Sequence, residues 1–247
     1  MTAALQSWEG SPRFPETAWS LVVSAGEQTS DQSRQALERL CSVYWYPIYG
    51  YVRRKGHDEE AARDLTQEFF TRLVEKNYVA SADHDRGRFR SFLLMAVQRF
   101  LLNEIDRHQT VKRGRGAPID SLDLETADER FCREPSSNTT PETLYERQWA
   151  LTILERALNR LKVRYPADRL AVMTPFLIGE APRGAYELAA TGLGISEGAL
   201  KVAVHRLRQH YKASLRAEIA DTVVSSSEVM GEVQYLITVL SRSDQTP

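Results

Sequence analysis

Apolar residues recur at helical spacing along most of the chain, and this pattern predicts its main elements. A first long helix carries its apolar face between residues 37 and 51. A second helix is predicted over residues 59–77, with Asp58 placed to cap its N-terminus. A third, over residues 90–108, has apolar residues on more than one side, which favours a central position in the fold. No segment alternates convincingly like a β-strand, so we predict an all-α protein.

Helical spacing is lost from about Lys112 to Thr140, where glycine, proline, serine and acidic residues accumulate. This composition indicates a linker and a domain boundary. The sequence Thr140-Pro141-Glu142 is typical of a helix start, with a cap, a proline in the first position and an acid in the first turn. Further helices are predicted at about 141–163, 166–180, 184–192 and 196–219, and a last amphipathic segment lies at 229–240.

The predicted architecture is therefore two helical domains joined by an acidic flexible linker. The domains span residues 30–111 and 141–222, the linker spans 112–140, and extensions at 1–29 and 223–247 flank them. The apolar stripe of the C-terminal extension must be buried against its own domain, the linker or a partner. Among these we favour packing within the chain.

The N-terminal residues do not combine a basic start with an apolar core, and no apolar run approaches the roughly 20 residues that a membrane span needs. We therefore expect a cytoplasmic protein with no membrane contact. Cys41 and Cys132 lack CxxC spacing, so we expect neither a disulfide framework nor a cysteine zinc site.

Charge is segregated along the chain although the net charge is only −1. Residues 86–116 hold eight basic residues against two acidic ones, and residues 117–150 hold eight acidic residues against three arginines. A second basic block covers residues 201–216. This alternation suggests two surfaces that face polyanions, joined by an acidic tether.

The second basic block has the layout of a helix-turn-helix. A short helix at 186–191 is followed by a turn at 192–194 and by a helix capped by Ser196, whose N-terminal end would enter a DNA major groove. The residues able to reach base edges are Glu197, Gly198, Lys201, Val202 and His205. The residues better placed for phosphates are Arg206, Arg208 and Lys212. The alternative is a packed helical hairpin with a solvated basic face.

Catalytic motifs are not found in the sequence. The pairs His57-Asp58 and His84-Asp85 resemble the His-Asp pair of helical metal phosphohydrolases. The chain lacks the further histidine and aspartate ligands that such a site needs. It also lacks a phosphate-binding glycine loop, a nucleophile elbow and a zinc motif. We therefore expect a binding protein rather than an enzyme, with no metal and no cofactor.

Three segments together resemble the small two-domain extracytoplasmic-function (ECF, group 4) sigma factors of the sigma-70 family. "DEEAARDLTQEFFTRLVEK" resembles the helix that docks on the clamp helices of RNA polymerase. "GRFRSFLLMAVQRFLLNEIDRH" resembles the helix that reads and melts the promoter −10 element. "AYELAATGLGISEGALKVAVHRLRQHYKASLR" resembles the helix-turn-helix that reads the −35 element. The order and spacing of the segments make the combination specific.

The resemblance implies a role for each basic or polar face. Core polymerase would be bound by the polar face of Asp64, Gln67, Glu68 and Arg72. The −10 element would be bound by Arg88, Arg90, Phe92, Arg99, Asn103 and Arg107, with a base-selecting loop near residues 77–89. The −35 element would be bound by the helix-turn-helix set given above, Ser196 included. Many relatives carry tryptophan where this chain has Phe92, which is also an acceptable core residue.

The implied partners are bacterial core RNA polymerase, through its clamp helices and flap, and promoter DNA. An anti-sigma regulator is a further partner that the resemblance allows. The linker acids would act in the polymerase cleft as an RNA-like polyanion or, equally, as a solvated tether; they are Asp120, Asp123, Glu125, Asp128 and Glu129. The implied function is promoter-directed transcription initiation with −10 melting. The alternative is a helix-turn-helix regulator that binds DNA without polymerase.

Overall fold

The computed structural model describes residues 31–75, 88–110, 127, 130–131, 140–178, 181–223 and 225–243. Secondary structure in these ranges is entirely helical, which confirms the predicted all-α class. The elements are α2 (Asp31–Arg54), α3 (Glu59–Glu75), α4 (Phe89–Thr110), α6 (Pro141–Arg164), α7 (Ala167–Met173), η3 (Thr174–Phe176), α8 (Ala185–Gly192), α9 (Glu197–Ala220), η4 (Ser226–Glu228) and α10 (Val229–Ser243).

Several predicted features lie in other parts of the chain. The N-terminal extension, most of the base-selecting loop at 77–89 and the five linker acids lie outside the described residues. Within the described ranges, no helix has both the length and the apolar character required to span a bilayer.

The helix starts follow their predicted capping residues. The Asp58 carboxylate accepts a hydrogen bond from the Ala61 N–H at 2.8 Å. The Thr140 hydroxyl accepts from the Thr143 N–H at 3.2 Å, with proline in the first turn of α6. The Ser196 hydroxyl accepts from the Ala199 N–H at 3.2 Å. Each cap satisfies an N–H that the first turn of a helix leaves without a partner.

The single helix predicted at 166–180 is wrong in its second half. Helix α7 ends at Met173, and a 3₁₀ turn, η3, follows with Pro175 inside it. Proline has no N–H for an α-helical hydrogen bond, and its ring clashes with the carbonyl four residues earlier. The chain therefore tightens into η3 and leaves the helical path before α8.

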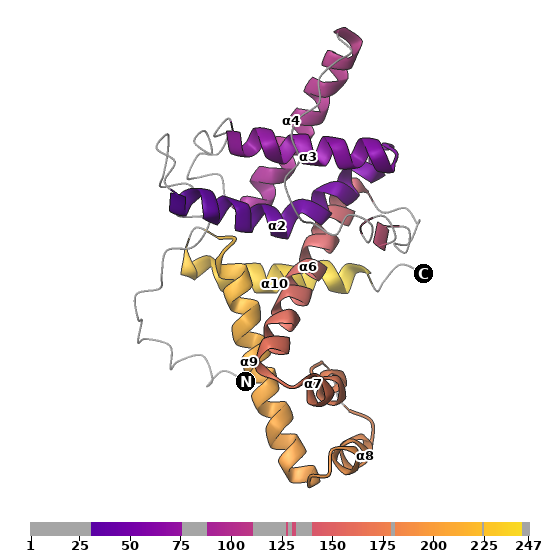
Figure 1. The fold of residues 1–247 in the computed structure, drawn as a ribbon, viewed down its shortest axis with the longest axis vertical. Coiled ribbons are helices and arrows are strands. Elements are labelled where there is room, and N and C mark those ends of the chain that lie inside the picture. Colours follow the sequence, from indigo (N-terminus) through magenta and orange to yellow (C-terminus); the bar gives the residue numbers. More distant parts are fainter. Residues whose placement is uncertain are drawn as a thin grey trace.

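A first core joins the two ends of the described chain. It is formed by α2, α3 and the first half of α4 together with the N-terminal half of α6, the end of α9, and α10. In Figure 1, α10 lies below α2, and α6 rises past α10 to reach α2. Trp149 of α6, Tyr44 of α2 and Phe89 of α4 are buried in this core. The C-terminal extension therefore packs within the chain, as predicted.

A second, smaller core lies at the far end of α6 and α9. These two helices run side by side in Figure 1, and α7 and α8 close their lower end. The buried residues are Leu161, Leu170, Met173, Phe176, Ala190, Leu200, Val204 and Leu207. The last three lie on one face of α9 at helical spacing. The cores thus divide within α6 and α9, and both helices connect them.

The predicted central position of α4 is correct only for its first half. Phe89, Leu93 and Val97 are fully buried there. Further along, Leu102 is 63% exposed and Ile105 is 50% exposed. Figure 1 shows this end of α4 projecting past α2 and α3.

Candidate polymerase and DNA interfaces

The predicted polymerase-binding face lies on α3, and its four residues differ in exposure. Asp64 is exposed, whereas Gln67 and Glu68 are partly buried. Arg72 is the most enclosed of the charged members, with 18% of its side chain exposed. Of the four, Asp64 is therefore the residue that presents itself most fully to a partner.

Arg72 connects α3 to α4. One terminal nitrogen donates to Glu104 Oε1 at 2.6 Å, the other bonds to Glu68, and the guanidinium lies 5.1 Å from the Phe100 ring centroid. Burial lowers the pKa of Arg72, but its hydrogen bonds to Glu104 and Glu68 and their charges outweigh burial and raise it. The contacts give Arg72 a role in holding the two helices together.

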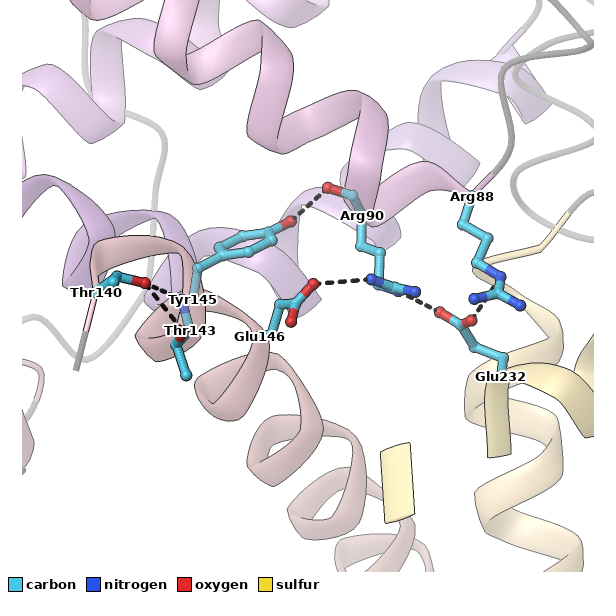
Figure 2. Close-up of polar contacts among 7 residues, drawn as sticks. All are labelled: Arg88, Arg90, Thr140, Thr143, Tyr145, Glu146 and Glu232. Carbon is cyan, nitrogen blue, oxygen red and sulfur yellow. Dashed lines mark hydrogen bonds and ion pairs between the residues drawn. The ribbon is translucent and has the colours of Figure 1, made fainter. Parts of the chain in front are cut away.

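Arg88 and Arg90, at the start of α4, share one carboxylate of α10. Figure 2 shows Glu232 between them. Arg90 Nε donates to Glu232 Oε1 at 2.6 Å, and Arg88 Nε forms an ion pair with Oε2 at 2.7 Å. A terminal nitrogen of Arg90 reaches Glu146 of α6 at 3.3 Å. The Glu232 side chain is 1% exposed, so the pairing takes place away from solvent.

Aromatic rings complete the surroundings of Arg90. Its guanidinium carbon lies 3.8 Å from the ring centroid of Tyr235 and 5.4 Å from that of Trp149. The Tyr145 hydroxyl donates to the Arg90 carbonyl at 2.9 Å (Figure 2). Burial lowers the pKa of Arg90, and the hydrogen bond and charge of Glu232 more than compensate, so that the net pKa is raised. The guanidinium is therefore held charged.

Sequence reasoning missed Glu232, Glu146 and Tyr235 as partners of these arginines. Glu232 lies three residues after Val229 and four before Leu236, on the apolar face of α10. An acid in that register must find a partner when the face is buried. The register was visible in the sequence, whereas the identity of the partner depended on the fold.

The other predicted −10 residues lie apart from this cluster. Phe92 is partly buried and stacks on Phe89, with ring centroids 6.1 Å apart. Arg99 and Asn103 are exposed on α4 toward its projecting half. The side chain of Arg107 lies outside the described residues. The described set is thus split between covered arginines at the start of the helix and exposed polar groups further along.

Helices α8 and α9 form the predicted helix-turn-helix. Gly194 in the turn has φ +62°, a left-handed conformation that suits glycine. Most of the residues predicted to face DNA are exposed: Ser196, Glu197, Gly198, Lys201, Val202, His205, Arg206 and Lys212.

Two basic residues of α9 already have partners within the protein. Lys201 Nζ forms an ion pair with Glu197 at 2.6 Å. The Glu197 hydrogen bond and charge raise the pKa of Lys201. Arg208 is partly buried, and its Nε donates to the Phe176 carbonyl at 2.9 Å. Arg208 is therefore tied to η3, while Lys212 on the same helix is exposed to solvent.

Potential metal ligands do not cluster in the described part of the chain. Among the described residues, no group of three or more histidine, cysteine, aspartate or glutamate side chains could hold an ion. Cys41 is a free thiol, and burial raises its pKa to about 12. A thiol with so high a pKa is a poor nucleophile at neutral pH.

Comparison with known proteins identifies one domain of the chain. Residues 46–111, from the last turns of α2 through α4, match the Sigma-70 region 2 family. The chain therefore contains a Sigma-70 region 2 domain. The match contains the polar face of α3 and the arginines of α4, so both predicted sites of the first domain fall within region 2. Members of the sigma-70 family are non-enzymatic.

A relative among characterised proteins extends the similarity beyond region 2. The ECF RNA polymerase sigma factor SigE of Mycolicibacterium smegmatis is 26% identical over 201 residues, which cover 81% of this chain and 70% of that protein. No solved structure matches the chain.

Proposed function

We propose that this chain is an ECF-type RNA polymerase sigma factor that directs core polymerase to promoters and opens the −10 element. The observation that carries the proposal is the region 2 match over residues 46–111. The similarity to a protein named as an ECF sigma factor, over most of both chains, supports the same function. Such a factor acts in the cytoplasm, and polymerase performs the chemistry.

Each face of the fold then has a binding task. The α3 face, with Asp64 exposed and Gln67 and Glu68 beside it, binds the polymerase clamp helices. An acidic exposed surface suits a partner surface that carries arginine or lysine. Helix α4 holds the melted −10 strand, for which Arg99 and Asn103 stand exposed. Polymerase and the melted strand therefore bind to neighbouring helices.

The helix-turn-helix reads the −35 duplex and contacts the polymerase flap. The N-terminal end of α9 is exposed, and Lys201, Val202 and His205 lie on it at the spacing that a major-groove helix uses. Val202 is 52% exposed, and an apolar side chain at such a position suits the methyl group of thymine. Lys212 contacts the phosphate backbone, which positions the helix without reading sequence.

The decisive experiment is co-elution of the purified protein with sigma-free bacterial core polymerase on a sizing column. Asp64→Lys is the test variant, because Asp64 is exposed and its replacement leaves the core unchanged. Asp168→Lys is the matched control, since Asp168 is an exposed acid on α7, outside the region 2 match. We expect stoichiometric co-elution of the wild type and the control, and loss of the Asp64 variant.

The other outcomes separate the rival readings. Co-elution of both variants would keep the function and place the docking face elsewhere. If the wild type fails to bind core polymerase but shifts duplex DNA alone, the chain is a polymerase-independent helix-turn-helix regulator, and the sigma assignment is wrong.

A further inference from the structure

The carboxylate of Glu232 pairs with both arginines at the start of α4 that are predicted to bind the −10 element. Its two oxygens lie 2.6 Å from Arg90 Nε and 2.7 Å from Arg88 Nε. Arg90 is 6% exposed in this arrangement, so no strand of DNA can reach its guanidinium. The two arginines that should contact nucleic acid are therefore paired with another part of the same chain.

Helix α10 supplies two kinds of group that a nucleotide also supplies. The Glu232 carboxylate is an anion with oxygens in hydrogen-bonding reach of arginine, as a phosphate is. The Tyr235 ring lies on the Arg90 guanidinium at 3.8 Å, as a base stacks on arginine in single-stranded complexes. The Arg88 guanidinium also faces that ring, at 5.9 Å.

Packing holds α10 in this position. Leu236 and Val239 are buried in the first core, and α10 contacts both α6 and α9. Glu146 of α6 holds Arg90 from the opposite side at 3.3 Å (Figure 2). Exposing Arg90 therefore requires α10 to leave α4, and it requires α6 to release the same guanidinium.

We propose that α10 is an internal competitor of single-stranded DNA, with Glu232 and Tyr235 taking the places of a phosphate and a base on Arg88 and Arg90. This inference rests on the proposed function, which makes the start of α4 a DNA-binding surface. In the closed chain Arg90 is buried, and Arg88 is paired with Glu232. DNA binding at this surface requires α10 to leave, so the closed state lowers the apparent affinity by the fraction of chains that are open.

The test measures binding of a fluorescein-labelled, random-sequence single-stranded DNA to the full-length protein without polymerase. Glu232→Gln removes the competing charge. Gln234→Lys is the matched control, because it changes the net charge by the same amount at an exposed position on the same helix. We expect Glu232→Gln to bind about tenfold more tightly than the wild type, since opening becomes easier. The control should gain much less.

Equal gains in the two variants would show a general charge effect and overturn the proposal, as would no gain in a Glu232→Gln protein with wild-type circular dichroism. If that variant does not fold, hydrogen exchange of the wild type decides. Amides of α10 should exchange faster when the same DNA is added, and unchanged exchange at saturating DNA would overturn the proposal. Neither assay contains polymerase, so failure of the sigma assignment is detected separately, by co-elution.

Discussion

Gln148 of α6 lies so close to Gly50 of α2 that a Cβ atom at position 50 would stand 2.1 Å from Gln148 Oε1. Both residues are buried where the two helices cross. Glycine therefore sets the approach of α6 to α2, and with it the joining of the region 2 helices to the C-terminal half of the chain. A larger residue must displace a buried side chain that has little room to move.

Gly50→Ala should lower the free energy of unfolding. Overpacking of a core costs about 1–3 kcal/mol, offset in part by the roughly 1 kcal/mol that alanine gains over glycine inside a helix. Gly50→Ala combined with Gln148→Ala should recover part of the loss, because the second change removes the clashing atoms. A urea-unfolding double-mutant cycle measures this coupling. Additive effects would show that the two residues do not constrain each other.

Substitutions of Arg72 and Asp64 on α3 should have different effects, the first on the stability of the fold and the second on polymerase binding. Arg72→Ala removes a charged hydrogen bond to Glu104, whose side chain is 11% exposed, and should cost roughly 1.5–3 kcal/mol of unfolding free energy. Asp64→Lys should leave the melting temperature unchanged and weaken core polymerase binding. Thermal melts together with co-elution check both. A folded Arg72→Ala protein that no longer binds polymerase would instead make Arg72 part of the docking face.

The sequence predicted helices, caps and faces well because these depend on neighbouring residues. Asp58, Thr140 and Ser196 cap the helices as their positions indicated. The break at Pro175 was also readable, since a proline inside a helical pattern ends or kinks it. That signal was missed because the flanking apolar spacing continued across it.

The arrangement of the candidate sites could not be read in the same way. Arg90 was predicted to be a DNA contact because it lies in the segment that resembles the −10 helix. Its burial depends on Glu232 and Tyr235, far along the chain, and no local pattern pairs them. The same holds for Gly50 and Gln148, whose contact follows from how α6 crosses α2.

The contact between α6 and α2 should weaken in acid through Glu142. Its Oε1 accepts from the Tyr51 hydroxyl at 3.2 Å and pairs with Lys55 at 3.4 Å. Burial raises the pKa of Glu142. Its backbone hydrogen bond and the charge of Lys55 lower the pKa by more than burial raises it, so the net pKa is below the ordinary 4.5. A carboxylate whose pKa is lowered by folding stabilises the fold when the pH is above its ordinary pKa. This contribution is lost as the pH falls through the lowered pKa.

Glu142→Gln should therefore be less stable than the wild type at neutral pH, and the difference should shrink below pH 4.5. Urea unfolding of both proteins from neutral pH down to about pH 3 measures this difference, and acid effects on the other carboxylates cancel between them. Asp168→Asn, at an exposed acid on α7, serves as the control. A difference that stays constant across the range would exclude a role for Glu142 ionisation.

The exposed end of α9 should divide into residues that read sequence and residues that hold the backbone. Lys201→Ala and His205→Ala should lower promoter-specific initiation. A lost base contact should cost about 1–3 kcal/mol of DNA-binding free energy and relax the sequence preference at that base. Lys212→Ala should weaken all promoters alike and flatten the salt dependence of binding. Arg208 is less suitable for this test, because its bond to the Phe176 carbonyl would be lost as well.

Run-off transcription with core polymerase on a set of −35 variants distinguishes the two classes. Lys162→Ala is the control, an exposed basic residue on α6 outside the helix-turn-helix. Glu197→Gln adds a second check, because it frees Lys201 from its ion pair at 2.6 Å and should strengthen the contact that Lys201 makes with DNA. If the Lys201 and Lys212 variants lose activity equally on every promoter, the N-terminal end of α9 does not read bases.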